Sequence, residues 1–474
     1  MLLTRGSNVN HVNVKGETPL FVACQKGHIV VVKMLLGFGR IGRLGRLGLG
    51  RLGLDHLGLF QDGLGHHGRL DIDVNHVRKG WSPLCIACEK GHVEIVEELL
   101  ANTNIDVNLA LTGNRNSGTT ALYIASEKGH VEIVRLLLAH TDVDVNQARN
   151  CDGTTPLCIA CQKGSVEIVR LLLAHTDIDV NRGKGNGATP LYIACEKGYV
   201  EIVEELLTYG VHVNKPNSNG WTSLLIACQA GRTIIVKMLF AHNVDVNQTN
   251  VNGFTPLLIA VQYGHVEIVK GLLAHGRIDI TPKMVNNIDG LTFQNISPLY
   301  IACQNGHTKV VEVLLAHNVD VNLDDALCVA CERGHLNIIK VLLAHGRINI
   351  NFQRDDGSTP LLIASSQNFF LEPRYMEVIL HLVFHGAIME GQPESWNWPS
   401  VLVDRLISIH DVNYTAILAF RTCCLHVTPD HALRAMSIHG MDLVHHIESF
   451  LVPRSIQVRR MILHLVAMKK MEKE

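Results

Sequence analysis

Apolar and polar residues recur along most of the chain in a unit of 33 to 34 residues. Two copies show the pattern: residues 153–181 read GTTPLCIACQKGSVEIVRLLLAHTDIDVN, and residues 187–214 read GATPLYIACEKGYVEIVEELLTYGVHVN. The central leucine of the unit recurs at Leu20, Leu84, Leu122, Leu157, Leu191, Leu224, Leu257, Leu299, Leu327 and Leu361. The uneven gaps between these leucines indicate insertions and one deletion in an array of ten units.

Each unit predicts two helices joined by a tight turn. In the copy that starts at residue 153, Thr155 can cap a helix, and Pro156 suits its first turn because the N–H there has no helical partner. Gly164 suits the left-handed residue that ends a helix. Apolar residues at helical spacing predict the buried faces: Leu157, Ala160 and Cys161, then Val166, Val169, Leu172 and Leu173. The D-I-D-V-N segment then leads into a hairpin-like finger, and neighbouring units must stack to bury their apolar faces.

This unit resembles the ankyrin repeat, with its G-x-T-P-L lead-in, Gly-His turn, V-x-x-L-L helix and D-V-N segment. The resemblance covers roughly residues 11–390 apart from the insertions. It implies an all-α solenoid of stacked helix-turn-helix units with hairpin-like fingers. It also implies non-covalent binding of a protein partner on the surface formed by the first helices and the fingers.

Two departures from the family pattern stand out. The family often has histidine directly after T-P-L, and any hydrogen bonding by that histidine must here be absent or replaced. The residues at this position are Phe21, Cys85, Tyr123, Cys158, Tyr192, Leu225, Leu258, Tyr300, Cys328 and Leu362. Residues 320–327, DVNLDDAL, lack the G-x-T-P lead-in, so we expect a shortened finger before the ninth unit and an interruption of the finger ladder there.

The array predicts six segments along the chain. Residues 1–10 indicate the tail of a truncated repeat, because residues 2–10 parallel residues 206–214; this would come from either a fragment or a poorly capped edge. Residues 11–36 form repeat 1, residues 37–66 an insertion, and residues 67–390 repeats 2 to 10. Residues 391–400 are a linker rich in turn residues. Residues 401–474 contain apolar helical pieces and are expected to form either a cap or a separate partner-binding module.

The insertion contains a G-x-G-x-x-G match at Gly37, Gly39 and Gly42. A dinucleotide-binding turn needs a preceding strand, but here a predicted helix precedes the match. Each glycine also costs a helix about 1 kcal/mol, so we expect no helix within 37–66. We interpret the segment as a flexible low-complexity loop or a sequence expansion. The alternative is an interaction loop that uses its leucines and arginines.

Charge and hydropathy exclude several classes of function. The net charge of −2 predicts no broad basic surface for nucleic acid, and 5% aromatic residues argue against base-stacking platforms. No apolar run reaches the length of a membrane span, and the polar start MLLTRGSNVN does not fit a signal peptide. We therefore expect a cytoplasmic or nuclear protein without nucleic-acid or membrane partners.

The cysteines and histidines fall at repeat-equivalent positions. Three C-x-x-C pairs, Cys85–Cys88, Cys158–Cys161 and Cys328–Cys331, lie on helices of non-adjacent repeats, so they cannot share one zinc ion. Most of the 13 cysteines are interpreted as buried thiols, and many of the 27 histidines begin or end second helices. We expect no metal and no cofactor. Since the common catalytic motifs are also missing, we expect neither an enzyme nor a small-molecule substrate.

The candidate partner-binding residues precede the glycine that ends each first helix. From the first to the fifth repeat the pair is Glu or Gln followed by Lys, which predicts a polar ladder with one lysine about every 10 Å. After Gln25-Lys26 the pairs are Glu89-Lys90, Glu127-Lys128, Gln162-Lys163 and Glu196-Lys197. The same pattern would follow from recent duplication without selection for a partner.

Aromatic residues follow the finger glycine at Trp81, Trp221 and Phe254. Each is either an interface anchor or a packing contact between neighbouring fingers. Together with the ladder they predict a scaffold that binds a protein. The alternative is a substrate-recruiting adaptor in a larger enzyme or signalling protein, with the activity in residues 401–474 or in sequence beyond this chain.

Overall fold

The computed structural model describes residues 9–46, 72–113, 117–281, 283–286, 292–317, 319–322, 325–365 and 373–387. The chain divides into two compact units, Met1–Val251 and Asn252–Glu474, and each is described by itself. Residues 1–8 of the predicted repeat tail, residues 47–66 of the insertion, the linker 391–400 and the segment 401–474 lie outside the described residues.

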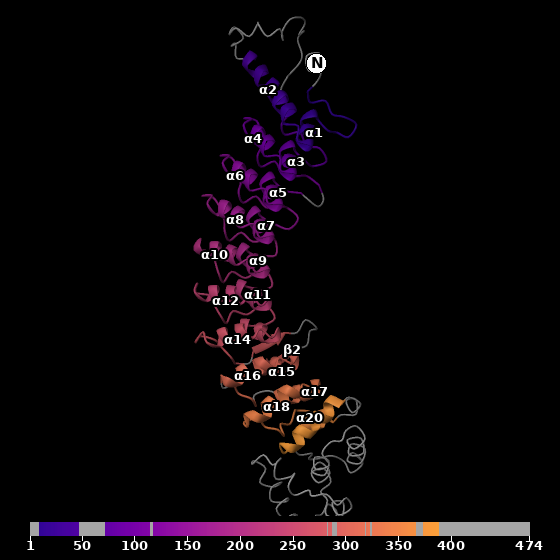
Figure 1. Cartoon of the computed structure of the whole chain (residues 1–474), viewed down its shortest axis with the longest axis vertical. Helices are drawn as coiled ribbons and strands as arrows, with labels where there is room; N and C mark the ends of the chain where they lie inside the picture. The colour runs from indigo at the N-terminus through magenta and orange to yellow at the C-terminus, as the bar shows by residue number, and fades with distance from the viewer. Residues whose placement is uncertain are drawn as a thin grey trace, which may run out of the picture. The chain divides into compact units, whose positions relative to one another are not determined.

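The first unit consists of paired helices in two layers (Figure 1). Each first helix contacts the first helix of the next repeat, and each second helix contacts the next second helix. The first helices are α1 (Pro19–Lys26), α3 (Pro83–Lys90), α5 (Ala121–Lys128), α7 (Pro156–Lys163), α9 (Pro190–Lys197) and α11 (Ser223–Gln229). The second helices are α2 (Ile29–Arg46), α4 (Val93–Leu100), α6 (Val131–Leu138), α8 (Val166–Leu173), α10 (Val200–Thr208) and α12 (Thr233–Phe240).

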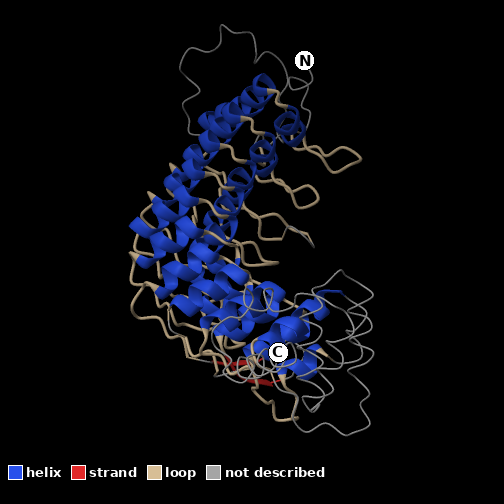
Figure 2. Ribbon diagram, turned by 60° about the horizontal axis from the view of Figure 1, so that its bottom comes forward, coloured by secondary structure: helices blue, strands red, loops and turns tan. Residues whose placement is uncertain are grey.

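The second unit repeats the same arrangement. Its first helices are α13 (Pro256–Gln262), α15 (Pro298–Asn305), α17 (Ala326–Arg333) and α19 (Pro360–Ala364). Its second helices are α14 (Val266–Leu273), α16 (Thr308–Ala316), α18 (Leu336–His345) and α20 (Pro373–Phe384). The insertion between Leu257 and Leu299 holds an antiparallel hairpin of β1 (Lys283–Asn286) and β2 (Thr292–Ile296), drawn in red in Figure 2. The fold is otherwise the all-α ankyrin-type solenoid that the repeat predicts.

The caps explain why these short segments form helices. A threonine or serine hydroxyl before the first helix accepts the main-chain N–H three residues later; in α7, Thr155 accepts from Cys158 at 3.2 Å. The same cap is formed by Thr18, Ser82, Thr120, Thr189, Thr222, Thr255, Ser297 and Thr359. Gly164 ends α7 at φ 77°, where a residue with a Cβ would be strained.

The core lies between the two helices of a repeat and between neighbouring repeats. In the second repeat Leu84, Ala87 and Cys88 of α3 are buried against Val96 and Leu99 of α4. Repeat-equivalent residues are buried in the following repeats. Because each repeat buries its apolar face only when the next one covers it, stability depends on the contacts between neighbours.

Helix α2 differs from the sequence prediction. It runs from Ile29 to Arg46 and includes Gly37, Gly39 and Gly42, where we expected no helix. That expectation was wrong for residues 37–46. A helix that is already nucleated gains one hydrogen bond per added residue, and the leucine, isoleucine and arginine residues between the glycines are favourable or tolerated in helices.

The shortened finger before the ninth unit is confirmed. Helix α17 begins at Ala326, shortly after Asn322, and its N-cap residue Asp325 makes no side-chain capping bond. Asp325 instead pairs with Arg354 from the next finger. A second helix also follows in repeat ten, as α20, despite the loss of the Gly-His turn.

Candidate functional site

The polar ladder lies in the last turns of α1, α3, α5, α7 and α9. Lys90, Lys128, Lys163 and Lys197 are all exposed. The residues before them, Glu89, Glu127, Gln162 and Glu196, are half-buried. Each lysine extends beyond the C-terminal end of a first helix, where a positive charge is favourable. The structure thus places the predicted residues in one line of repeat-equivalent positions on successive contacting helices.

Neighbouring positions of the ladder interact with one another. The Lys128 Nζ atom lies 3.9 Å from Glu89 Oε1 of the preceding repeat, which is a long and partly exposed ion pair. Lys197 Nζ lies 3.4 Å from Glu196 Oε2. These exposed pairs contribute at most about 1 kcal/mol each, so a partner with a better-placed charge can displace them.

The fingers of the first unit are bonded to one another and project as tan loops beside the helices (Figure 2). From the third repeat onward, a main-chain N–H of each finger of this unit donates to a carbonyl of the preceding finger. The bonds are Thr112 to Gly80 (3.2 Å), Asn150 to Ser117 (2.9 Å), Gly185 to Asp152 (2.7 Å), Ser218 to Asn186 (2.9 Å) and Val251 to Asn219 (3.1 Å). At Gly80, φ is 87° and an added Cβ would lie 1.7 Å from the Thr112 oxygen, so only glycine allows this approach.

The fingers are also tied to the first helices. Lys184 Nζ donates to Gln162 Oε1 of the ladder at 2.6 Å. The guanidinium of Arg78 lies over the Phe21 ring at 5.6 Å and pairs with Glu17 at 2.9 Å. These contacts hold the fingers against the helices and leave a largely preformed surface.

Arg149 makes the same kind of contact two repeats later. Its guanidinium lies 5.3 Å from the centre of the Tyr123 ring, and its Nε donates to Asp152 Oδ1 at 3.0 Å. The hydrogen bonds from Arg149 hold the pKa of Asp152 well below its usual range. Burial raises the pKa of Tyr123 to about 12, so its hydroxyl stays neutral. This cluster is structural, since its charges satisfy each other.

The finger aromatics are neither fully exposed nor fully buried. Trp81, Trp221 and Phe254 are each half-buried. The main chain of Trp81 forms a bridge with Arg78, and the Trp221 carbonyl accepts the Asn217 N–H at 2.9 Å. Trp81 and Trp221 therefore lie at closed finger turns of the first unit, while Phe254 belongs to the second unit. Whether they are anchors for a partner stays a prediction.

A ladder of asparagine side chains connects successive repeats, and the sequence analysis missed it. Asn108 Nδ2 donates to the Asp142 carbonyl at 2.6 Å, while Asn108 Oδ1 accepts the Asp144 N–H at 2.8 Å. Asn75, Asn146 and Asn322 bridge their neighbours in the same way. The recurring D-V-N segment was the available signal, because the asparagine amide can donate through Nδ2 and accept through Oδ1 at the same time.

The Gly-His turn has a packing role. The ring of His130 lies against Gly91 of the preceding repeat, where a Cβ would approach the ring within 2.9 Å. Tyr199 packs in the same way on Gly164. In the second unit His307 Nε2 bonds the Gln262 carbonyl at 3.0 Å, which satisfies a group at the end of α13.

The cysteines on the first helices are buried thiols, as predicted. Burial raises the pKa of Cys85 to about 11 and that of Cys88 well above its usual range. Cys85 Sγ donates to the Leu109 carbonyl at 3.6 Å, and Cys158 Sγ donates to the Arg182 carbonyl at 3.5 Å. At these two positions a thiol thus supplies a weak bond where the family often has histidine. Within the described residues no three His, Cys, Asp or Glu side chains are arranged to hold a metal ion.

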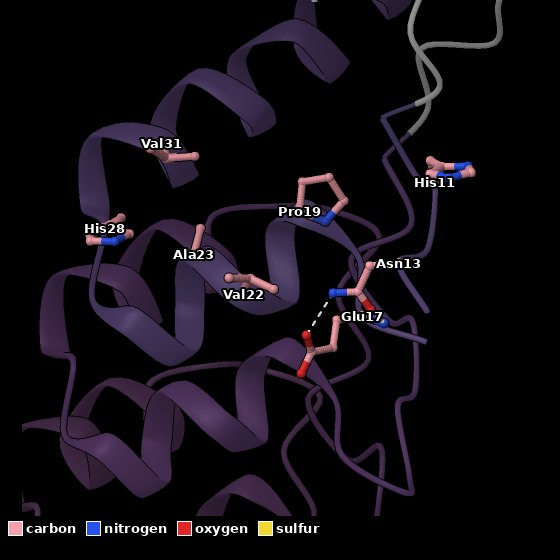
Figure 3. Close-up of a pocket in the computed structure, with 8 residues that line it drawn as sticks. All are labelled: His11, Asn13, Glu17, Pro19, Val22, Ala23, His28 and Val31. Carbon is pink, nitrogen blue, oxygen red and sulfur yellow. Dashed lines mark hydrogen bonds between the residues drawn. The ribbon is translucent and has the colours of Figure 1, made fainter. Parts of the chain in front are cut away.

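A pocket of about 400 Å³ lies at the edge of the first repeat (Figure 3). Its lining is mainly apolar and includes Val22, Ala23 and Val31, with Asn13 and Glu17 joined by a 2.8 Å hydrogen bond. Val31 is 42% exposed, whereas the equivalent Ile95 is 2% exposed beneath the first repeat. The pocket is therefore an uncovered repeat face, and it contains none of the ladder residues. No helix in the described ranges is long and apolar enough to cross a bilayer.

Comparisons with known proteins agree with this geometry. The family model "Ankyrin repeats (3 copies)" matches residues 56–149, 141–217, 208–284 and 299–390, and the model "Ankyrin repeat" matches residues 15–41. No curated protein matches the chain. Among solved structures, the human ASB11 ankyrin repeat domain is 27% identical with a TM-score of 0.42, over 51% of this chain and all of that domain. Since the family models match most of its length, the chain belongs to the ankyrin-repeat family.

Proposed function

We propose that the chain is a scaffold that binds a protein partner on the surface formed by its first helices and fingers. The observation that carries this proposal is the ladder. Four exposed lysines, Lys90, Lys128, Lys163 and Lys197, recur beside half-buried polar residues on successive contacting helices. Stacked arrays form an extended concave binding surface, and the resemblance to the ankyrin repeat implies that first helices and fingers line it.

The finger contacts support this function. Bonds between fingers and from fingers to helices keep the surface in one conformation before a partner binds. Binding then costs little conformational entropy. The buried free thiols fit a reducing compartment, the cytoplasm or the nucleus.

A substrate-recruiting adaptor is the second candidate. It would place an activity in residues 401–474, which lie outside the described residues, or in sequence beyond this chain. In that case the array would still bind protein, and the captured partner would be modified rather than only held.

The test is affinity capture from native cell extract with three baits, read by quantitative mass spectrometry. The baits are the unchanged chain, a ladder variant and a matched control with the same number of charge reversals on the second helices of the same repeats. The ladder variant carries Lys90→Glu, Lys128→Glu, Lys163→Glu and Lys197→Glu. The control carries Glu94→Lys, Glu132→Lys, Glu167→Lys and Glu201→Lys, all at exposed positions.

We expect a partner that the unchanged chain and the control retain and the ladder variant loses. Circular dichroism first establishes that all three baits are folded. A partner retained equally by all three would contradict the ladder as the binding site. The finger aromatics and residues 401–474 would then be the next candidates for the binding site.

A further inference from the structure

The charges of the first unit are separated between its structural layers, although the whole chain has a net charge of only −2. On the first helices and fingers, each exposed charged residue in the described part of this unit is basic. On the first helices these are Lys26, Lys90, Lys128, Lys163 and Lys197. On the fingers they are Lys15, Lys79, Arg182 and Lys215. The net charge of the whole chain does not show this local excess of basic residues.

On the described second helices and the turns that follow them, exposed acidic residues outnumber the exposed basic residues, which include Lys33, Arg135, Arg170 and Lys237. Exposed glutamates recur at the second position of α4, α6, α8 and α10, as Glu94, Glu132, Glu167 and Glu201. The turns add exposed aspartates at positions 106, 142, 144, 177 and 179. The two sets of charges nearly cancel in the sum, which is why composition could not show the separation.

Several acidic residues on the basic side have a basic partner within it. Glu17 pairs with Arg78 at 2.9 Å, and Asp152 is bonded to Arg149. The Glu196 side chain is 44% exposed, similar to 42% for Lys197, but its carboxylate lies 3.4 Å from the Lys197 ammonium. Basic side chains outnumber acidic ones on the described first helices and fingers, so the net charge of this side is positive.

We infer that the partner segment that binds the ladder is an acidic stretch of polypeptide lying across the successive repeats. This inference rests on the proposed function and adds the chemistry of the partner. Complementary charge speeds encounter and selects against basic partners.

The spacing of the ladder fits an extended peptide. Stacked helices lie about 8–10 Å apart, so the lysines recur at about that distance. An extended peptide in the polyproline II conformation has three residues per turn and rises about 3.1 Å per residue, so every third side chain returns to the same face about 9 Å further along. A peptide with a carboxylate at every third position can thus place one carboxylate at each ladder lysine.

The alternation of signs favours a peptide over a nucleic acid. Glu89, Glu127 and Glu196 lie directly beside the ladder lysines. A phosphate backbone is negative along its whole length and would be repelled at each of these carboxylates. A peptide can place neutral side chains at those points and carboxylates at the lysines.

The test uses the full-length chain and a labelled 15-residue peptide with glutamate at every third position and serine or alanine between. Binding is measured by fluorescence anisotropy at low and moderate salt. A carbodiimide then joins carboxylates to amines in contact, and mass spectrometry locates the cross-links. The ladder variant and the second-helix control described above are measured in parallel.

We expect cross-links at Lys90, Lys128, Lys163 and Lys197 rather than at Lys33 and Lys237 of the second helices. The ladder variant should bind at least tenfold more weakly, and the control within twofold of the unchanged chain. A third variant with Glu89→Gln, Glu127→Gln and Glu196→Gln should bind at least twofold more tightly, because it removes repulsion without touching a lysine.

Three results would overturn the inference. One is cross-links spread equally over all exposed lysines. The second is equal binding of a peptide with the same composition but clustered glutamates. The third is tighter, ladder-dependent binding of a single-stranded thymidine oligonucleotide. If a cellular partner needs the ladder but the peptide does not bind, only this inference is refuted and the proposed function stands. If neither depends on the ladder, the proposed function fails as well.

Discussion

Replacement of Asn108 by alanine tests whether the asparagine ladder holds neighbouring repeats together. Asn108 makes two hydrogen bonds to the next repeat, one to the Asp142 carbonyl at 2.6 Å and one from the Asp144 N–H at 2.8 Å. A typical bond contributes about 1 kcal/mol, and water can replace part of it at this exposed site. We expect the loss of about 1–2 kcal/mol of local stability.

Local hydrogen exchange is the suitable assay, because long repeat arrays often unfold in several steps and give no single free energy. A loss of about 1–2 kcal/mol predicts that peptides covering Asp144 exchange roughly 5–30 times faster in Asn108→Ala. Asn219→Ala is the matched control: this exposed finger asparagine bonds the next finger through its main-chain carbonyl. We expect its exchange to change little.

Asn108→Asp separates the two bonds. The carboxylate still accepts the Asp144 N–H but cannot donate to the Asp142 carbonyl. Exchange at Asp144 should stay closer to the unchanged chain than in Asn108→Ala. If Asn108→Ala leaves the exchange of this segment within twofold of the unchanged chain, the bridge does not stabilise the repeat contact and the reasoning is refuted.

Three further changes test the caps, the turns and the thiols. Gly164→Ala should lower the melting temperature by more than Gly129→Ala. Both glycines adopt positive φ, but an added Cβ would meet a ring, that of Tyr199, only at Gly164. Equal melting temperatures would exclude that contact. Thr155→Ala should cost about 1 kcal/mol by loss of the N-cap and Thr155→Ser much less, as measured by thermal unfolding; equal losses would argue against the cap. At pH 8 iodoacetamide should label the exposed Cys151 well before Cys88, whose pKa is raised by burial; rapid native labelling of Cys88, read by mass spectrometry, would contradict its burial.

Much of the candidate site was predictable because its residues occupy fixed positions in the repeat. Lys90 and Lys128 precede a glycine that ends a helix, so their place in the last turn follows from the local pattern. Whether the acidic neighbour is exposed was not predictable. Glu89 is partly covered and reaches Lys128 of the next repeat, which depends on how the repeats stack.

The charge of the side that contains the first helices and fingers shows the limit of composition. A net charge of −2 describes the sum over the chain, whereas a partner meets one side of it. The separation follows from the register of the repeat, since lysines recur at the end of first helices and glutamates at the start of second helices. Periodicity contained this information, but only the two helix layers convert positions along the chain into two differently charged sides.

The sequence by itself determined the helix pairs, their caps and the ankyrin-type repeat, because a helix depends on residues within a few positions of each other. It did not determine the continuation of α2 to Arg46, where propagation of an already nucleated helix outweighed the low helix propensity of the glycines. The tertiary structure alone decided the asparagine bridges, the bonds between fingers and the charge pairs between repeats, such as Lys128 with Glu89. These contacts join residues about one repeat apart, such as Asn108 and Asp144, and form only when stacking brings successive repeats together.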